Sequence, residues 1–322
     1  MSAPGPAGVD LRVETLGRTF ATPVLAASGT FGYAQEMAPF TDLRAIGGVV
    51  TKGISPRPRA GNPAPRICET ASGMLNSIGL ENVGAEAFVT EKLPFLRESG
   101  TRVIVNFFGE RAEEYAECAA ALSGHDGIDA LEMNISCPNI KAGGLEYGTD
   151  PEVAGRLVES CRRATGLPLL VKLSPNVTDV VALARACVQP GADGLSIINT
   201  VSAMAVDARR RRPRIATVFG GLSGPAIKPI ALRMVFQVAR AKLGVPLLGA
   251  GGIMTGEDAA EFLLAGATLV QVGTASFADP DAAARVGREL AEFCAETGVA
   301  RAADLRGALE VDVAWLPFSP GG

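Results

Sequence analysis

Histidine is almost missing from this chain of 322 residues, which contains only His125. Histidine is the most frequent acid–base catalyst in enzymes. The one present lies in the segment Ser-Gly-His-Asp-Gly, whose glycines predict a loop, and we expect a solvated side chain. An acid–base reaction in this protein would therefore depend on cysteine, lysine, aspartate or glutamate.

Several patterns that define other classes of protein are also missing. There is no run of about 18 apolar residues, so the sequence predicts no membrane span. Residues 1–9 lack the charged and apolar regions of a signal peptide and are expected to be a disordered tail. The net charge is −4, which argues against nucleic acid as a general partner.

The cysteines are scattered, without a Cys-x-x-Cys pair. This spacing predicts no disulfide framework and no metal or iron–sulfur site within the chain, and it fits a reducing cytoplasm. No Gly-x-Gly-x-x-Gly follows an early strand, so the dinucleotide-binding pattern is absent too. The six cysteines are Cys68, Cys118, Cys137, Cys161, Cys187 and Cys294.

What the sequence does contain is an alternation of short apolar runs with longer amphipathic segments over residues 10–305. Eight βα units in one domain predict a (β/α)8 TIM barrel, which typically takes about 250 residues; an open doubly wound sheet is the alternative. Residues 306–322 are expected to be a C-terminal tail. The strands are expected at 23–28, 48–52, 102–107, 130–135, 169–173, 195–199, 246–249 and 269–273.

Helices are expected between most of these strands. Asp150 and Thr255 precede two of them and have the side chains that cap helix N-termini. The helical segments are expected at 112–122, 151–165, 179–187, 228–242 and 256–265.

Polar residues and glycines gather where the predicted strands end. In a barrel these ends converge on one face, where the chemistry of such folds is located. An open sheet would instead spread them along an edge, so their number favours the barrel. The strand ends carry Ser28, Lys52, Asn106, Asn134, Lys172, Asn199, Thr200, Gly251, Gly252, Gly273 and Thr274.

The segment Asn-Ile-Ser-Cys-Pro-Asn, residues 134–139, follows the fourth of these strands. Asparagine amides suit a flat ligand with alternating carbonyl and N–H groups. Cys137 is either a structural cysteine or, with a lowered pKa, a base or nucleophile.

Glycine turns close the last two units, at 249–252 and 272–275, and each precedes a predicted helix. Glycine lets backbone N–H groups approach a phosphate, and a helix N-terminus favours an anion, although glycine also serves ordinary tight turns. Residues 220–225 could complete such a site. A mononucleotide such as FMN is favoured over NAD, with Lys52 and Lys172 near the flavin; the alternative for each lysine is a snorkelling or salt-bridged residue.

Together these segments resemble class 1 dihydroorotate dehydrogenase. The resemblance covers about residues 10–305, and Gly61-Asn-Pro-Ala-Pro-Arg66 is similar to class 1B, the catalytic subunit of the NAD-linked form. The motifs are Asn134-Ile-Ser-Cys-Pro-Asn139, Asn76-Ser-Ile-Gly-Leu80, Val171-Lys-Leu-Ser-Pro-Asn-Val177, Ile198-Asn-Thr200, Gly221-Leu-Ser-Gly-Pro225 and Gly249-Ala-Gly-Gly252.

The resemblance implies a barrel that holds one FMN and a pyrimidine. It implies that the pyrimidine contacts Lys52, Asn76, Ser77, Ile78, Gly79, Leu80, Asn134, Asn199 and Thr200, with Asn139 as a further ligand. It implies that FMN contacts Ser28, Lys52, Gly53, Asn106, Asn134, Lys172, Ile198, Gly224, Gly251, Gly252, Gly273 and Thr274.

The implied reaction is the oxidation of dihydroorotate to orotate in pyrimidine synthesis. Cys137 would take the C5 proton, and the hydride at C6 would pass to FMN. The electrons would then reach NAD⁺ through a partner subunit with FAD and a [2Fe–2S] cluster, in a heterotetramer built on a catalytic homodimer.

Three other functions remain open from the sequence. They are the fumarate-linked class 1A enzyme, a flavoprotein similar to dihydropyrimidine dehydrogenase, and a non-catalytic FMN-binding barrel. The run Arg209-Arg-Arg-Arg212 is expected to be a solvated loop, with a docking patch for an acidic partner as the alternative.

Replacement of Cys137 tests its predicted role. Cys137→Ala should retain FMN but slow flavin reduction by dihydroorotate at least about 100-fold, because a general base contributes that much or more. Cys137→Ser should be slow and recover at high pH, since serine is a much weaker acid. Stopped-flow absorbance under anaerobic conditions measures both rates, and a near-normal rate for Cys137→Ala would contradict the assignment.

Overall fold

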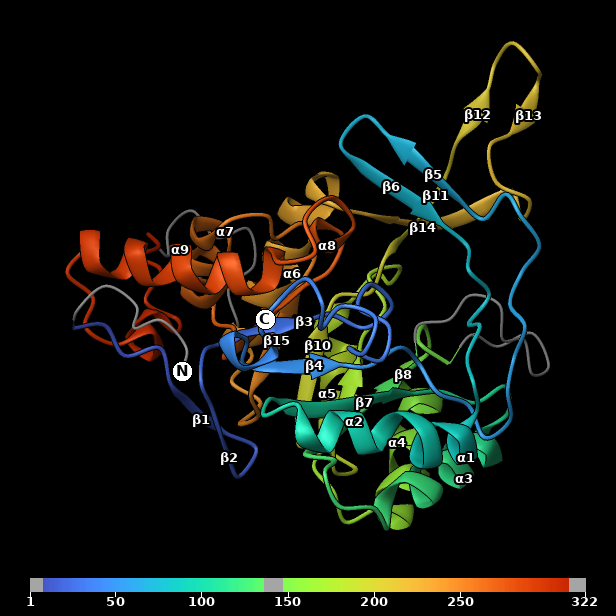
Figure 1. The fold of residues 1–322 in the computed structure, drawn as a ribbon, viewed down its shortest axis with the longest axis horizontal. Helices are drawn as coiled ribbons and strands as arrows, with labels where there is room; N and C mark the ends of the chain where they lie inside the picture. The colour runs from blue at the N-terminus through green and yellow to red at the C-terminus, as the bar shows by residue number, and fades with distance from the viewer. Residues whose placement is uncertain (1–7, 136–146, 313–322) are drawn as a thin grey trace.

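The chain forms a closed barrel of eight parallel strands (Figure 1). The computed structural model describes residues 8–135 and 147–312. Around the barrel the strands are β3 (Val24–Ala26), β4 (Gly48–Val50), β7 (Arg102–Phe107), β8 (Ala130–Asn134), β9 (Leu169–Lys172), β10 (Gly194–Ile197), β15 (Leu247–Ala250) and β16 (Leu269–Val272). All eight predicted strands are present, and the pairing of β16 with β3 closes the sheet. The TIM barrel is confirmed and the open sheet is wrong.

Helices cover the outside of the barrel, and every helix predicted from the sequence is present. Asp150 accepts hydrogen bonds from the N–H groups of Glu152 and Val153, and Thr255 forms a capping box with Asp258, as expected. The longer helices are α3 (Ala112–Ser123), α4 (Pro151–Ala164), α5 (Val180–Val188), α6 (Lys228–Arg240), α7 (Gly256–Leu264) and α9 (Ala282–Glu296). The shorter ones are α1 (Ala85–Ala87), α2 (Leu93–Glu98) and α8 (Ala275–Ala278).

The barrel interior is built in layers, because alternate side chains of each strand point inward. The lowest layer is apolar, and Val13 and Phe20 of the hairpin β1 (Val13–Thr15) and β2 (Arg18–Phe20) close it from below. Gly194 belongs to this layer, because a Cβ there would lie 2.5 Å from Leu170 Cδ2. The other members are Leu25, Val50, Ile104, Ala130, Leu170, Leu248 and Leu269.

Two residues further along most of the strands, the next inward side chain is polar. This polar layer contains Asn106, Glu132, Lys172, Ser196 and Gln271, all of them buried. A step of two residues along a strand is about 6.6 Å, so this layer lies one side chain above the apolar floor. The change from apolar to polar side chains places the hydrophilic end of the barrel at the carboxyl ends of its strands.

A second, antiparallel sheet stands over this end of the barrel, and the sequence did not predict it. Its strands, in spatial order, are β11 (Val201–Met204), β14 (Phe219–Ser223), β6 (Gly73–Asn76) and β5 (Ile67–Thr70). They come from the segments that follow β4 and β10, are short, and include Gly220 and Gly221, so no single segment has a clear strand pattern.

The basic run lies in a hairpin next to this sheet. Strands β12 (Val206–Asp207) and β13 (Arg212–Pro213) pair, and Arg209–Arg212 are exposed around their turn. Figure 1 shows this hairpin projecting away from the barrel. Over residues 8–135 and 147–312, none of the helices combines the length and the apolar character that a bilayer crossing requires.

Candidate functional site

A cavity of about 780 Å³ opens at the carboxyl ends of the barrel strands, beneath the antiparallel sheet. Every described residue that the resemblance assigned to FMN or substrate lines it. Cys137 and Asn139 lie outside the described residues. The lining includes Ser28, Lys52, Gly53, Asn76, Ser77, Ile78, Gly79, Leu80, Asn106, Asn134, Lys172, Ile198, Asn199, Thr200, Gly224, Gly251, Gly252, Gly273 and Thr274.

One wall of the cavity is the turn of residues 76–80 that follows β6. The Asn76 amide donates to the Gly221 carbonyl at 3.2 Å, which joins β6 to β14. Gly79 has a φ of +78°, and a Cβ there would lie 2.5 Å from the Asn62 backbone nitrogen, so the turn requires glycine. Asn62 also donates to the Ser77 carbonyl at 2.9 Å. The segment that resembles class 1B therefore supports the predicted pyrimidine turn from behind.

Asn134 at the end of β8 and Asn199 after β10 meet at the cavity. The Asn199 amide donates to Asn134 Oδ1 at 3.3 Å, and Asn199 Oδ1 accepts from the Thr200 N–H at 2.8 Å. The Tyr115 hydroxyl donates to the Asn134 carbonyl oxygen at 2.9 Å. These bonds fix the orientation of two amides that the sequence predicted to bind a flat, polar ligand.

The floor of the cavity is organised around Glu132, which is 0% exposed. Its Oε1 accepts from Asn106 Nδ2 at 2.7 Å, and its Oε2 accepts from Gln271 Nε2 at 2.7 Å and from Ser196 Oγ at 2.5 Å. Sequence reasoning missed Glu132, Ser196 and Gln271. The available signal was the period of two residues in each strand, which places these polar positions inside the barrel.

Lys172 lies between this floor and the cavity. Its Nζ is 3.7 Å from Glu132 Oε1 and donates to Ser28 Oγ at 3.0 Å. The ion-paired alternative offered by the sequence applies, and this lysine also lines the cavity. Its binding role remains a prediction.

Two glycine turns face the cavity where the sequence predicted a phosphate site. Gly252 has a φ of +79°, and a Cβ there would lie 2.9 Å from the Gly224 carbonyl oxygen and 2.7 Å from Lys228 Cβ. The turns at Gly224 and Gly252 are thus in close contact, and a side chain at Gly252 would push them apart. Gly273 and Thr274 complete the group and lead directly into α8.

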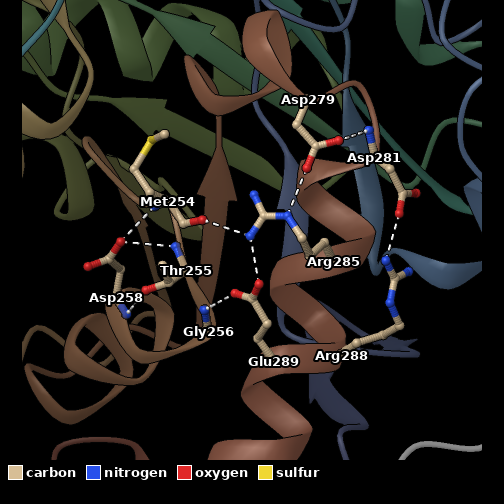
Figure 2. A network of polar contacts seen from close by, with 9 residues as sticks. All are labelled: Met254, Thr255, Gly256, Asp258, Asp279, Asp281, Arg285, Arg288 and Glu289. Carbon is tan, nitrogen blue, oxygen red and sulfur yellow. Dashed lines mark hydrogen bonds and ion pairs between the residues drawn. The ribbon is translucent and has the colours of Figure 1, made fainter.

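Several N–H groups at the N-terminus of α7 already donate to carboxylates, and the phosphate site that the sequence predicts at this helix end remains a prediction. Asp258 accepts from the N–H groups of Met254 and Thr255 at 2.7 and 3.0 Å, and Glu289 accepts from the Gly256 N–H at 2.8 Å (Figure 2). Carboxylates already occupy the place that an anionic ligand would take at a helix N-terminus.

Arg285 of α9 joins the two loops that carry the glycine turns. Its guanidinium donates to Asp279 at 2.7 Å, to the Met254 carbonyl at 3.2 Å and to Glu289 at 2.7 Å (Figure 2). Met254 follows β15, whereas Asp279 follows α8 after β16. One side chain therefore holds the last two loops of the barrel at a fixed separation.

The cavity has polar groups that the described part of the protein leaves without a partner. Gln271 Oε1 and Ser77 Oγ are buried, line the cavity, and have no hydrogen-bond partner among the described residues. A buried polar atom without a partner is costly, so these atoms fit a ligand that hydrogen-bonds to them. With two lysines and the glycine turns, the donor set suits a planar polar group joined to an anion.

The described cysteines are not candidates for the base. Burial raises the pKa of Cys161 and of Cys187 to about 12, and it also raises the pKa of Cys118 and Cys294. These four thiols pack in the core, where the uncharged form is favoured. Cys68 lies in β5 and is not among the residues that line the cavity.

Comparison with known proteins identifies the family. Residues 10–294 match the family model described as dihydroorotate dehydrogenase. The chain belongs to the dihydroorotate dehydrogenase family. It is 58% identical over 302 residues to the Geobacter sulfurreducens protein named dihydroorotate dehydrogenase B (NAD(+)), catalytic subunit, covering 94% of this chain and 99% of that one.

A Pelobacter propionicus protein of the same name is 58% identical over 301 residues, covering 94% of this chain and 99% of the relative. Among solved structures, DHODH in complex with ferulenol from Eimeria tenella matches with a TM-score of 0.77 and 25% identity, covering 95% of this chain and 91% of that one. The sequence resemblance to this family is thereby confirmed.

Acid should weaken the hydrogen bonds by which Asp258 holds the loop after the glycine turn of residues 249–252. Burial would raise the pKa of Asp258, but hydrogen bonds from Lys228, Met254 and Thr255 lower it below its usual 3.8. A lowered pKa stabilises the fold fully above pH 3.8 and progressively less as the pH falls below that value. We expect Asp258→Asn to cost about 1–2 kcal/mol of unfolding free energy at pH 7, as for a lost helix cap.

Urea unfolding of both proteins at pH 7, 4.5 and 3 measures this effect. The difference between them should shrink between pH 4.5 and pH 3. Asp304→Asn, at an exposed ion pair with Arg301, is the control and should change stability by at most about 0.5 kcal/mol. A difference for Asp258→Asn that is independent of pH would contradict this interpretation.

Proposed function

We propose that this chain is the catalytic subunit of an NAD⁺-linked dihydroorotate dehydrogenase and oxidises dihydroorotate to orotate in pyrimidine synthesis. The observation that carries the proposal is the convergence of all the described predicted ligands on one cavity in a chain 58% identical to relatives of that name. The same relatives favour this function over the fumarate-linked enzyme, over a dihydropyrimidine dehydrogenase and over a non-catalytic barrel.

We infer that the cofactor is FMN. Its phosphate would be held by the turns at Gly224, Gly251–Gly252 and Gly273–Thr274, which lie together at one side of the cavity. Its ring would contact the polar strand ends Ser28, Lys52, Gly53, Asn106, Asn134, Lys172 and Ile198. Bound FMN supplies a hydride acceptor. The residues around the cofactor would bind it, orient it and neutralise its negative charge.

The substrate would contact the turn at 76–80, together with Lys52, Asn134, Asn199 and Thr200. These groups offer amide donors and an ammonium to carbonyl and carboxylate oxygens. When the C5 proton is removed, negative charge develops on the adjacent C4 carbonyl, and preorganised donors stabilise it. Cys137 would take that proton, and Asn139 would be a further ligand.

We propose that electrons leave through a partner subunit that carries FAD and a [2Fe–2S] cluster, in a heterotetramer built on a homodimer of this chain in the cytoplasm. The relatives' designation as a catalytic subunit supports a separate partner. The lack of a dinucleotide pattern and of Cys-x-x-Cys pairs in this sequence supports the same division of labour.

An anaerobic half-reaction tests the function directly. Purified chain should show the visible spectrum of bound FMN, and addition of dihydroorotate should bleach the flavin band. Dihydrouracil, which lacks the carboxylate, is the matched control and should bleach it far more slowly. An FMN-loaded protein that responds to dihydrouracil and not to dihydroorotate would contradict the substrate assignment.

The electron acceptor is tested under turnover. The chain alone should oxidise dihydroorotate with an artificial dye as acceptor and should reduce NAD⁺ at no more than a trace rate. Absorbance at the dye band and at the NADH band follows the two reactions. Efficient NAD⁺ reduction by the isolated chain would refute the requirement for a partner.

A further inference from the structure

The polar floor of the cavity contains one acidic side chain, Glu132, which the proposed chemistry does not use. It is fully buried in β8, two residues before Asn134, which lines the cavity. Burying a carboxylate is costly unless donors surround it. Three neutral donors and one lysine meet its two oxygens, so the site is built to keep this group in place.

Glu132 sets the orientation of the Asn106 amide. A carboxylate oxygen at 2.7 Å can only accept, so the amide presents its NH2 group to Glu132 and its Oδ1 to the other side. That oxygen lies toward Gly53, where a Cβ would come within 2.8 Å of it, and both residues line the cavity. Without the carboxylate, either orientation of this amide would be possible.

Glu132 also acts on Lys172, the cation of the floor. The ion pair is 3.7 Å long, and its side chains are 7% and 0% exposed. Solvent screens such a pair weakly, so the carboxylate offsets part of the lysine charge as seen from the cavity. The neutral donors Asn106, Ser196 and Gln271 hold the carboxylate without changing the net charge of the floor.

We propose that Glu132 is a positioning residue that orients Asn106 and lowers the reduction potential of the bound flavin by offsetting the charge of Lys172. The proposal rests on the inference that FMN occupies this cavity. Reduction adds negative charge to a flavin, so an uncompensated lysine beneath it would favour the reduced form. The buried carboxylate limits that preference and keeps the reduced cofactor able to pass electrons onward.

The test is the two-electron midpoint potential of the bound flavin in Glu132→Gln. This variant keeps the side-chain size and removes the charge. We expect the equilibrium to move at least tenfold toward reduced flavin, which for a two-electron couple is a positive shift of about 29.6 mV. A spectroscopic titration against a reference dye measures it without turnover.

Ser196→Ala is the matched control. It removes a buried neutral donor to Glu132 Oε2 and leaves the charge of the carboxylate unchanged. It should therefore lower thermal stability but change the equilibrium constant for flavin reduction less than threefold. A potential for Glu132→Gln that equals that of the wild type, or an equal shift in Ser196→Ala, would overturn the proposal.

Glu132→Asp covers the case in which Glu132→Gln fails to retain flavin. The aspartate variant keeps the charge with a shorter side chain, and its equilibrium constant for flavin reduction should stay within threefold of the wild-type value. A tenfold shift in this variant would overturn the role of charge. Wild-type protein without flavin would instead refute the proposed function, so the two failures are distinct.

Discussion

The two-residue period of the strands in a closed barrel is the constraint from which the site follows. Because alternate side chains of a strand point inward, two residues that are two positions apart in a strand occupy successive levels of the barrel interior. Leu170 lies in the apolar layer, and Lys172, two residues later, lies in the polar one. The same step separates Ala130 from Glu132. The change from apolar to polar side chains along most of the strands therefore determines where the core ends and the cavity begins.

A buried polar layer is stable only if it is nearly complete in hydrogen bonds. Glu132 provides the acceptors, and donors from β7, β10 and β16 converge on it because the barrel is closed. The layer is also rigid, since a change in one member leaves another without a partner. The ligands above it are thus held in place by strands rather than by loops. Arg285 links the two loops that carry the glycine turns.

The sequence predicts those elements of the fold and the site whose pattern lies within a single segment of the chain. The eight barrel strands are mostly apolar runs, and each was found from its own segment. The antiparallel sheet was not found, because β6 joins it by pairing with β14, which lies more than 140 residues further along the chain. Most site residues were found because they end strands or match the motifs of the family. Glu132 was missed because a single acidic residue inside an apolar run gives no local signal of a function. Its role becomes clear only in the closed barrel, where donors from three other strands converge on it.

A crystal structure of the purified chain with orotate would test the central claim most directly. The account predicts FMN in the cavity, with its phosphate at the turns of Gly224, Gly252 and Thr274 and its ring above Asn106 and Lys172. It predicts orotate against the turn of residues 76–80, with Cys137 facing its C5 atom. Flavin outside this cavity, or orotate away from that turn, would contradict the account.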